Sequence, residues 1–247
     1  MQFREYGERV KKLNFTVPEK REFWLAALIL GFAYSWNKWG GVEFDLWVGI
    51  GNLLAAFIVA ISTLFIHHWG QRLWAAYKGY KVEHKVWWYG VGAAFLITLL
   101  SNGNVVLLAV TGTFISIIPH QRMGSFRYGP NVKDFAMIAL MGPLANIVAA
   151  GFLKTLQPWL PFTNLIEMFF IFSLTFAGWN LLPLPPLDGS RILFSSRLLY
   201  ILVAAAVIGY VMLIQLTGVY SWIWALAIGA VTWLIFYASI ERKLGSH

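Results

Sequence analysis

The chain has 247 residues, of which 59% are hydrophobic and only 12% are charged, and its formal net charge is +8 at pH 7. A soluble domain carries roughly 45–50% apolar and about 25% charged residues, so this composition excludes an ordinary soluble protein and predicts an integral membrane protein. In such a protein Lys and Arg indicate topology, and we expect no nucleic-acid partner. Cysteine is absent, which excludes disulfides and Cys-ligated zinc.

Residues 1–22 are rich in charge and lack a short apolar core before a small-residue cleavage site, so we expect a cytosolic N-terminal segment. A single membrane domain is predicted over 23–240, followed by a cytosolic tail at 241–247. Apolar stretches run through this domain at about 23–37, 46–67, 87–118, 134–156, 165–182, 198–217 and 220–240. Most of them approach the roughly 20 residues that a spanning helix needs.

The stretch 87–118 is too long for one span, and the turn-forming sequence SNGN interrupts it at 101–104. A hairpin or re-entrant segment is therefore predicted there. The expected fold is an all-α integral membrane protein, a polytopic bundle of about six spanning helices plus this segment.

The positions of Lys and Arg predict one orientation for the whole bundle. Basic residues occur in the N-terminal segment, in the connection after 67, in the loop before 134, around 191–197 and at the C-terminal end. All of these regions fall on one side if each span crosses once and the segment 87–118 enters and returns to the same side. The expected location is the cell membrane, multi-pass, with the N- and C-termini cytosolic.

Polar residues end the second apolar stretch, in the sequence TLFIHHWGQR at 63–72. Buried polar groups in an apolar segment are costly unless they have partners, so His67, His68 and Gln71 require an explanation. A second polar cluster lies at 180–193, NLLPLPPLDGSRIL, where closely spaced prolines cannot continue a helix. Asp188 follows this break and is a candidate functional residue. The alternative is that it caps the next helix and pairs with Arg191.

The second cluster resembles a signature of the site-2 protease family of intramembrane zinc metalloproteases, whose pattern is Asn-x-x-Pro-x-x-Pro-Leu-Asp-Gly. The matching positions are Asn180, Pro183, Pro186, Leu187, Asp188 and Gly189. The stretch ALMGPLANIVAA at 139–150 is similar to the family's Gly-Pro-x-x-Asn helix, which includes Asn146. The resemblance covers roughly residues 20–195 and is best to the compact archaeal members.

The family's first signature is His-Glu-x-x-His on the second span, where residues i and i+4 hold zinc and the Glu acts as general base. On this chain the motif reads HHWGQ. His67 stands at the first ligand, His68 at the catalytic Glu and Gln71 at the second ligand. The resemblance therefore implies a degenerate metal site of His67, Gln71 and Asp188. It implies a cleft formed with Asn146, Asn180, Pro183, Pro186 and Gly189.

An amide oxygen is a poorer zinc ligand than imidazole, and without zinc the water nucleophile is lost. We expect His67, Gln71 and Asp188 to converge without metal, and His68 to be non-functional as a base. We expect no cofactor. If the altered site still binds a metal, that metal is expected to be zinc. His84 and His120 are interpreted as solvated loop histidines.

Three functions remain open. The first is a pseudoprotease that keeps the scaffold and binds a membrane protein or transmembrane helix without cutting it. The second is a structural subunit of a larger membrane complex. The third is an active intramembrane zinc endopeptidase with an atypical metal site. In each case the lipid bilayer is a partner.

Overall fold

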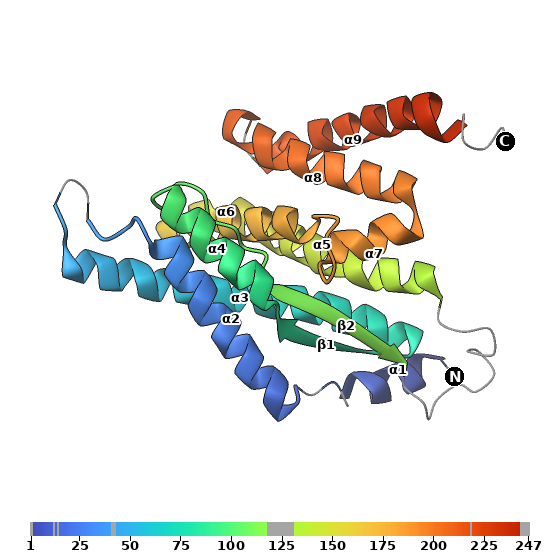
Figure 1. Cartoon of the computed structure of the whole chain (residues 1–247), viewed down its shortest axis with the longest axis horizontal. Helices are drawn as coiled ribbons and strands as arrows, with labels where there is room; N and C mark the ends of the chain where they lie inside the picture. Colours follow the sequence, from blue (N-terminus) through green and yellow to red (C-terminus); the bar gives the residue numbers. More distant parts are fainter. Residues whose placement is uncertain are drawn as a thin grey trace.

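The structure is a computed structural model that describes residues 2–11, 13, 15–40, 43–117, 131–217 and 219–242. His120, which the sequence places in a loop, lies outside the described residues. The helices and strands follow one another as α1 (Gln2–Lys11), α2 (Val17–Ser35), α3 (Leu46–Lys78), β1 (Tyr80–Val86), α4 (Trp88–Leu100), β2 (Thr111–Ile117), α5 (Val132–Leu156), η1 (Gln157–Trp159), α6 (Thr163–Asn180), α7 (Asp188–Ser195), α8 (Arg197–Thr217), η2 (Val219–Ser221), α9 (Trp222–Phe236) and η3 (Tyr237–Glu241) (Figure 1).

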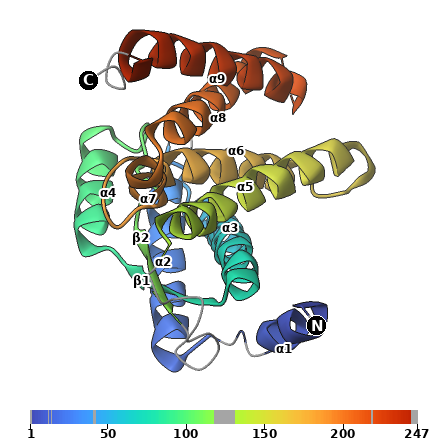
Figure 2. The ribbon, with the colours of Figure 1, turned by 90° about the vertical axis from the view of Figure 1, so that its right-hand side faces the viewer.

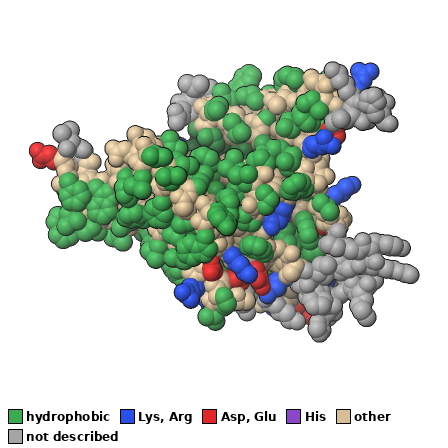
Figure 3. Space-filling view, viewed as in Figure 1, with side chains coloured by type: hydrophobic (Ala, Val, Ile, Leu, Met, Phe, Trp, Pro, Cys, Tyr) green, Lys and Arg blue, Asp and Glu red, His purple; other side chains and the backbone are tan. Residues whose placement is uncertain are grey.

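The chain is a nearly all-α membrane protein. Within the described residues, four helical segments are long and apolar enough to cross a bilayer, at Leu46–Lys78, Val132–Trp159, Arg197–Ile214 and Trp222–Glu241. Helices α2 and α6 coincide with the two remaining predicted spans and bring the number close to the expected six. Hydrophobic side chains cover most of the face shown in Figure 3, which is the surface that a lipid environment requires.

Helix α3 is longer than the sequence predicted. The apolar stretch ends at residue 67, but the helix continues for three further turns to Lys78. It stops at Gly79, whose φ of +82° is the left-handed conformation that commonly ends helices. The polar residues were expected to end the span. They instead lie inside the helix, because other elements bury them.

The segment 87–118 reverses direction at 101–104, as predicted, but only its first half is helical. Helix α4 ends at a tight turn in which Asn102 and Gly103 have positive φ values. The chain then returns in an extended conformation and forms β2, which pairs antiparallel with β1 from Tyr80↔Ile117 to Val86↔Thr111. The sequence reading missed this two-stranded ribbon because it assigned 80–86 to a solvated loop.

The ribbon and α2 lie on one side of α3, and α5 and α6 lie on the other (Figures 1 and 2). Helices α8 and α9 pack mainly against each other and form an outer layer, which α7 joins to the rest. Their contact is close at Gly229, where a Cβ would come within 2.9 Å of the Ala206 side chain. The largest apolar core lies between α2, α3, α4 and α6.

Candidate functional site

The first part of the site lies on α3, where His67, His68 and Gln71 are each at most 1% exposed. Residues four apart share one face of a helix, whereas adjacent residues point about 100° apart. His67 and Gln71 consequently lie on the same side of α3, and His68 points in another direction.

The second part is positioned by the proline-rich break between α6 and α7. Asp188 is the first residue of α7 and is 1% exposed. Gly189 is needed next to it, because a Cβ there would come 2.0 Å from the carbonyl oxygen of Leu181. The break thus folds tightly back on the end of α6 and aims Asp188 at α3.

The two parts meet in a direct contact between His67 Nε2 and Asp188 Oδ2 at 2.9 Å. On the other side of the ring, Asn146 Nδ2 lies 3.3 Å from His67 Nδ1. With a proton on Nε2, His67 donates to Asp188 and accepts from Asn146, so both ring nitrogens have a partner. The ring of Phe176 packs edge-on against this imidazole. His67 is thereby fixed on three sides.

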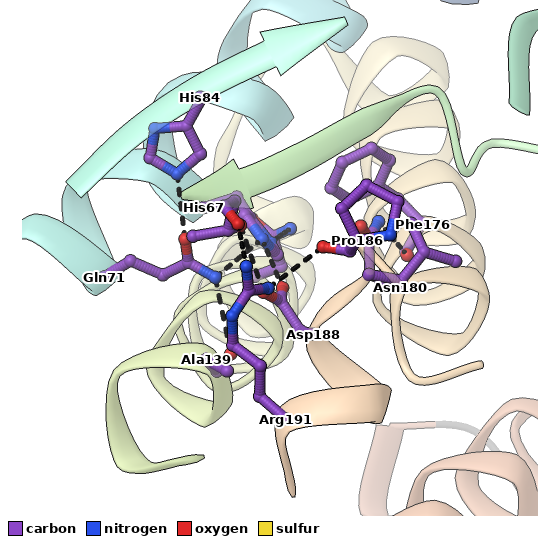
Figure 4. A network of polar contacts seen from close by, with 12 residues as sticks. His67, Gln71, His84, Ala139, Phe176, Asn180, Pro186, Asp188 and Arg191 are labelled. Carbon is purple, nitrogen blue, oxygen red and sulfur yellow. Dashed lines mark hydrogen bonds and ion pairs between the residues drawn. The ribbon is translucent and has the colours of Figure 1, made fainter. Parts of the chain in front are cut away.

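Gln71 completes the cluster, and all of its polar atoms are engaged (Figure 4). Its Nε2 donates to the carbonyl oxygen of Ala139 at 3.4 Å; it also lies 3.3 Å from His67 Nε2, which donates to Asp188 and does not accept from it. Its Oε1 accepts from His84 Nε2 at 2.8 Å and from Thr113 Oγ1 at 3.1 Å. The amide therefore joins α3 to α5 and to both strands of the ribbon.

Thr113 on β2 connects the two parts a second time. Its hydroxyl lies 3.1 Å from both Gln71 Oε1 and Asp188 Oδ1, and it shares one proton between these acceptors. Its backbone oxygen accepts from Arg191, whose Nη1 also donates to the Pro186 carbonyl oxygen at 2.9 Å. Sequence reasoning missed Thr113 because the strand that positions it was not predicted.

His68 lies beside this network without joining it. Its ring stacks on His84 with 3.5 Å between centroids and an interplanar angle of 16°, and it also contacts Phe23. Neither ring nitrogen of His68 has a hydrogen-bond partner among the described residues. His68 is thus stacked on the ribbon, and that it does not act as a base stays a prediction.

His84 is buried at 4% exposure, so the prediction of a solvated loop histidine is wrong. A strand could have been predicted from YKVEHKV, because every second residue of a strand points to the same face. Tyr80, Val82, His84 and Val86 all point inward. Burial, followed by the charges of His68 and Arg72, lowers the pKa of His84 well below its ordinary value of 6.5. A neutral His84 donates from Nε2 to Gln71.

Carboxylates of α2 hold the ribbon from its outer edge. Glu19 Oε1 accepts from the backbone nitrogen of His84 at 3.3 Å and forms a buried ion pair with Arg72. Glu22 Oε2 accepts from the backbone nitrogen of Val86 at 2.8 Å. The sequence reading placed both acids in a cytosolic lead-in and gave them no role.

Gly142, the glycine of the Gly-Pro-x-x-Asn stretch, sets how closely α5 approaches α3. A Cβ there would lie 2.5 Å from His67 Nε2 and 2.8 Å from Gln71 Nε2. A Cβ at Gly70 on α3 would likewise lie 2.7 Å from the Met141 carbonyl oxygen and from the Ala145 Cβ of α5. The glycine pair lets the two helices cross in contact at the polar cluster.

The remaining predicted cleft residues have different positions. Pro186 lies at the network, where its ring touches Gly112 and its carbonyl oxygen accepts from the backbone nitrogen of Thr113 at 3.4 Å. Asn180 is buried, but its side chain donates to the Phe176 carbonyl oxygen one turn earlier. Pro183 is exposed. The structure therefore does not bring Asn180 and Pro183 to the hydrogen-bonded cluster.

The donor set does not fit zinc. The described residues contain no group of three His, Asp or Glu side chains that could hold a metal ion. His67 and Asp188 are two suitable ligands, but the third position is Gln71, and its oxygen is turned toward His84 and Thr113. A structural zinc site has four protein ligands, and a catalytic one has three. The expectation that no cofactor is bound stays a prediction.

The chain is 23% identical over 203 residues to a Methanocaldococcus jannaschii protein named "Putative zinc metalloprotease". The similarity covers 81% of this chain and 95% of that protein. No family model matches, and no solved structure matches. The chain is thus a membrane protein with distant similarity, over most of its length, to a protein named as a zinc metalloprotease.

Proposed function

We propose that this chain is a non-catalytic membrane protein of site-2-protease-like architecture, a pseudoprotease that binds a transmembrane segment of a partner without cutting it. The observation that carries the proposal is the engagement of Gln71, whose oxygen accepts from His84 and Thr113 at the position where the resemblance requires a zinc-binding histidine. The similarity to a protein named as a zinc metalloprotease supports a shared scaffold.

Within the described part of the chain, two chemical steps of a zinc peptidase lack the groups that they need. Zinc lowers the pKa of its bound water to about 7, and a set of two good ligands does not hold it firmly. A general base contributes about 10² to 10⁴ in rate, and His68 is stacked on His84 with neither nitrogen bonded to a described residue.

The scaffold is stable without the metal because the former ligands bond to one another. Asp188 accepts from His67 and Thr113, and Gln71 bonds to α5 and to both strands of the ribbon. Buried polar groups with partners no longer carry the desolvation penalty of unpaired ones. A retained fold with satisfied polar residues is what a binding role requires.

The test is metal content and proteolysis of purified protein, with a restoring variant as the comparison. We expect far less than one zinc per chain by mass spectrometry of metals, and no chelator-sensitive cleavage of a model transmembrane substrate. The double variant His68→Glu/Gln71→His should gain zinc toward one per chain, and adding Asp188→Ala should remove it. Melting temperatures in detergent verify that each variant is folded.

One result would overturn the proposal: stoichiometric zinc in the unmodified chain, lost in His67→Ala and in Asp188→Ala together with cleavage activity. A complex of fixed stoichiometry that survives mild detergent would instead support a structural subunit. Substoichiometric single-pass partners support the binding role.

The proposed orientation places residues 1–22 and the tail 241–247 in the cytosol, with both polar clusters near that side. Because the natural chain has no cysteine, single cysteines introduced at residues 8 and 242 report sidedness without background. Both should resist an impermeant thiol reagent in intact cells and react after lysis. Labelling of either site in intact cells would contradict the orientation.

A further inference from the structure

A second polar region lies at the other end of the bundle. A pocket of about 330 Å³ opens between the end of α2, the turn after α4 and the middle of α6. Asn52, whose side chain bonds to the backbone oxygen of Lys38 at 2.7 Å, lies 15 residues before His67 on α3. At 1.5 Å per residue this separates the pocket region from His67 by about 22 Å.

Among the described residues, the lining of this pocket contains one cation and no acid. The residues that line it are Tyr34, Asn37, Lys38, Gly103, Asn104, Val106, Leu108, Ile171 and Thr175. No carboxylate of the described residues lies within ion-pair distance of Lys38 Nζ. Partial burial lowers the pKa of this lysine, so its charge has lost solvation without gaining a counterion. An anion in the pocket would supply the missing partner.

Lys38 is held in place rather than free in solvent. Its Nζ lies 3.7 Å from the centroid of the Tyr34 ring, and that ring packs edge-on against Phe172. Its backbone nitrogen donates to the Ser35 oxygen, and its backbone oxygen accepts from Asn52. The cation is therefore fixed at the wall of the pocket before any ligand binds.

The turn after α4 forms the opposite wall and is equally well fixed. Gly103 has a φ of +76°, and a Cβ there would lie 2.9 Å from the Asn37 Cβ. Its backbone nitrogen donates to the Thr98 oxygen at 2.7 Å. Close contact between the turn and the end of α2 thus defines the shape of the pocket.

The rest of the lining is apolar. Val106, Leu108 and Ile171 form it, and Ile171 is 46% exposed on the outer side of α6. Neighbouring large side chains on α4, such as Leu100 at 80% exposed, face the same apolar surroundings. A ligand that fills the pocket needs one anionic end for Lys38 and an apolar end for this surface.

We propose that the pocket binds an anionic amphiphile, with a phosphate or carboxylate head at Lys38 and its hydrocarbon chain against Ile171 and Val106. Asn37, Asn104 and Thr175 supply amide and hydroxyl groups around the head. A phospholipid of net negative charge and a free fatty acid share this chemistry. The proposal stands apart from the proposed function, because it uses none of the residues at His67 and Asp188.

The experiment measures lipid binding by the full chain in a neutral detergent, by native mass spectrometry and by the shift in melting temperature. The probes are phosphatidylglycerol, oleate, phosphatidylcholine and inorganic phosphate. Phosphatidylglycerol or oleate should bind and raise the melting temperature, whereas phosphatidylcholine should not. Lys38→Gln should weaken that binding about fivefold, the size expected for one basic residue at an anionic lipid.

Lys133→Gln is the control, because it removes the same charge from an exposed position away from the pocket. Lys38→Arg should retain binding. Ile171→Asn should weaken the binding of both phosphatidylglycerol and oleate. Selective binding of phosphatidylglycerol identifies a phospholipid head, and selective binding of oleate identifies a carboxylate.

Equal losses in Lys38→Gln and Lys133→Gln would overturn the proposal, because the attraction would then come from overall charge. The proposal would also be overturned if inorganic phosphate bound saturably and displaced the lipid while Ile171→Asn left lipid binding unchanged. The pocket would then be a site for a free anion. The melting temperature of each variant in phosphatidylcholine alone separates loss of binding from loss of fold.

Discussion

The polar cluster around His67 and the pocket around Lys38 lie in the same membrane bundle but differ in whether their polar side chains have partners. In the cluster, His67 bonds to Asp188, the Thr113 hydroxyl joins Asp188 to Gln71, and all four side chains are buried. In the pocket, the half-buried Lys38 lies over an aromatic ring with no acid of the described residues beside it. Satisfied polar groups stabilise the fold, whereas an unpaired cation in an open pocket is available to a ligand.

The cluster also joins more of the chain than the pocket does. Its members come from α3, α5, α7 and both strands of the ribbon. Substitutions there should lower the free energy of unfolding, and substitutions at the pocket should change it little. The predictions below test this difference by equilibrium unfolding in mixed micelles.

Asp188→Ala should have the largest effect. It removes the acceptor of His67 and of Thr113, and each buried donor that is left without an acceptor costs about 1–3 kcal/mol. Asp134→Ala is the control, because its ion pair with Lys78 is partly exposed and should contribute at most about 1 kcal/mol. Similar losses in the two variants would contradict a structural role for the cluster.

Gly142→Ala should cost about 1–3 kcal/mol, because the added methyl group would push into His67 and Gln71. Gly151→Ala lies on the same helix, where a Cβ meets no atom of the described residues within 4 Å, and it should stabilise α5 by up to about 1 kcal/mol. Opposite signs are the expected result. If both variants stabilise the protein, α5 and α3 are not in close contact at this crossing.

Thr113→Val keeps the shape of the side chain and removes its hydroxyl. The loss should be about 1–2 kcal/mol, because acceptors on Gln71 and Asp188 would lose a donor in a buried site. Thr111→Val is the matched change on the same strand, since the Thr111 side chain makes no hydrogen bond with any described residue. Equal effects would show that Thr113 does not connect the two parts of the cluster.

Lys38→Gln should cost at most about 1 kcal/mol without lipid, the value of the lost contact with the Tyr34 ring. A loss above 2 kcal/mol in neutral detergent would place Lys38 among the structural residues and remove the contrast between the two regions.

His68→Phe should change stability least, by about 0.5 kcal/mol or less. The phenyl ring can stack on His84 and contact Phe23, and neither nitrogen that it replaces has a hydrogen-bond partner among the described residues. His67→Phe is the comparison and should destabilise the protein strongly, because it removes the bond to Asp188. A large loss in His68→Phe would indicate a polar role for His68.

Much of the bundle was predictable because the length of an apolar run is a local property. The stretches at 46–67, 134–156, 165–182 and 198–217 each fall on a helix. The end of α3 was not predictable, because its polar residues are tolerated only where other elements bury them. The ribbon was missed because strand pairing depends on a partner about 30 residues away.

The sequence by itself determined that the chain is a helical membrane protein with two unusual polar segments, since composition and residue spacing are properties of the chain alone. The resemblance predicts that His67 and Asp188 converge, but only the tertiary structure decided that these residues, 121 apart in the chain, bond directly at 2.9 Å. It also decided that His84 and Thr113 engage the oxygen of Gln71. The physical reason is that a buried polar group requires partners, and packing rather than sequence order supplies them.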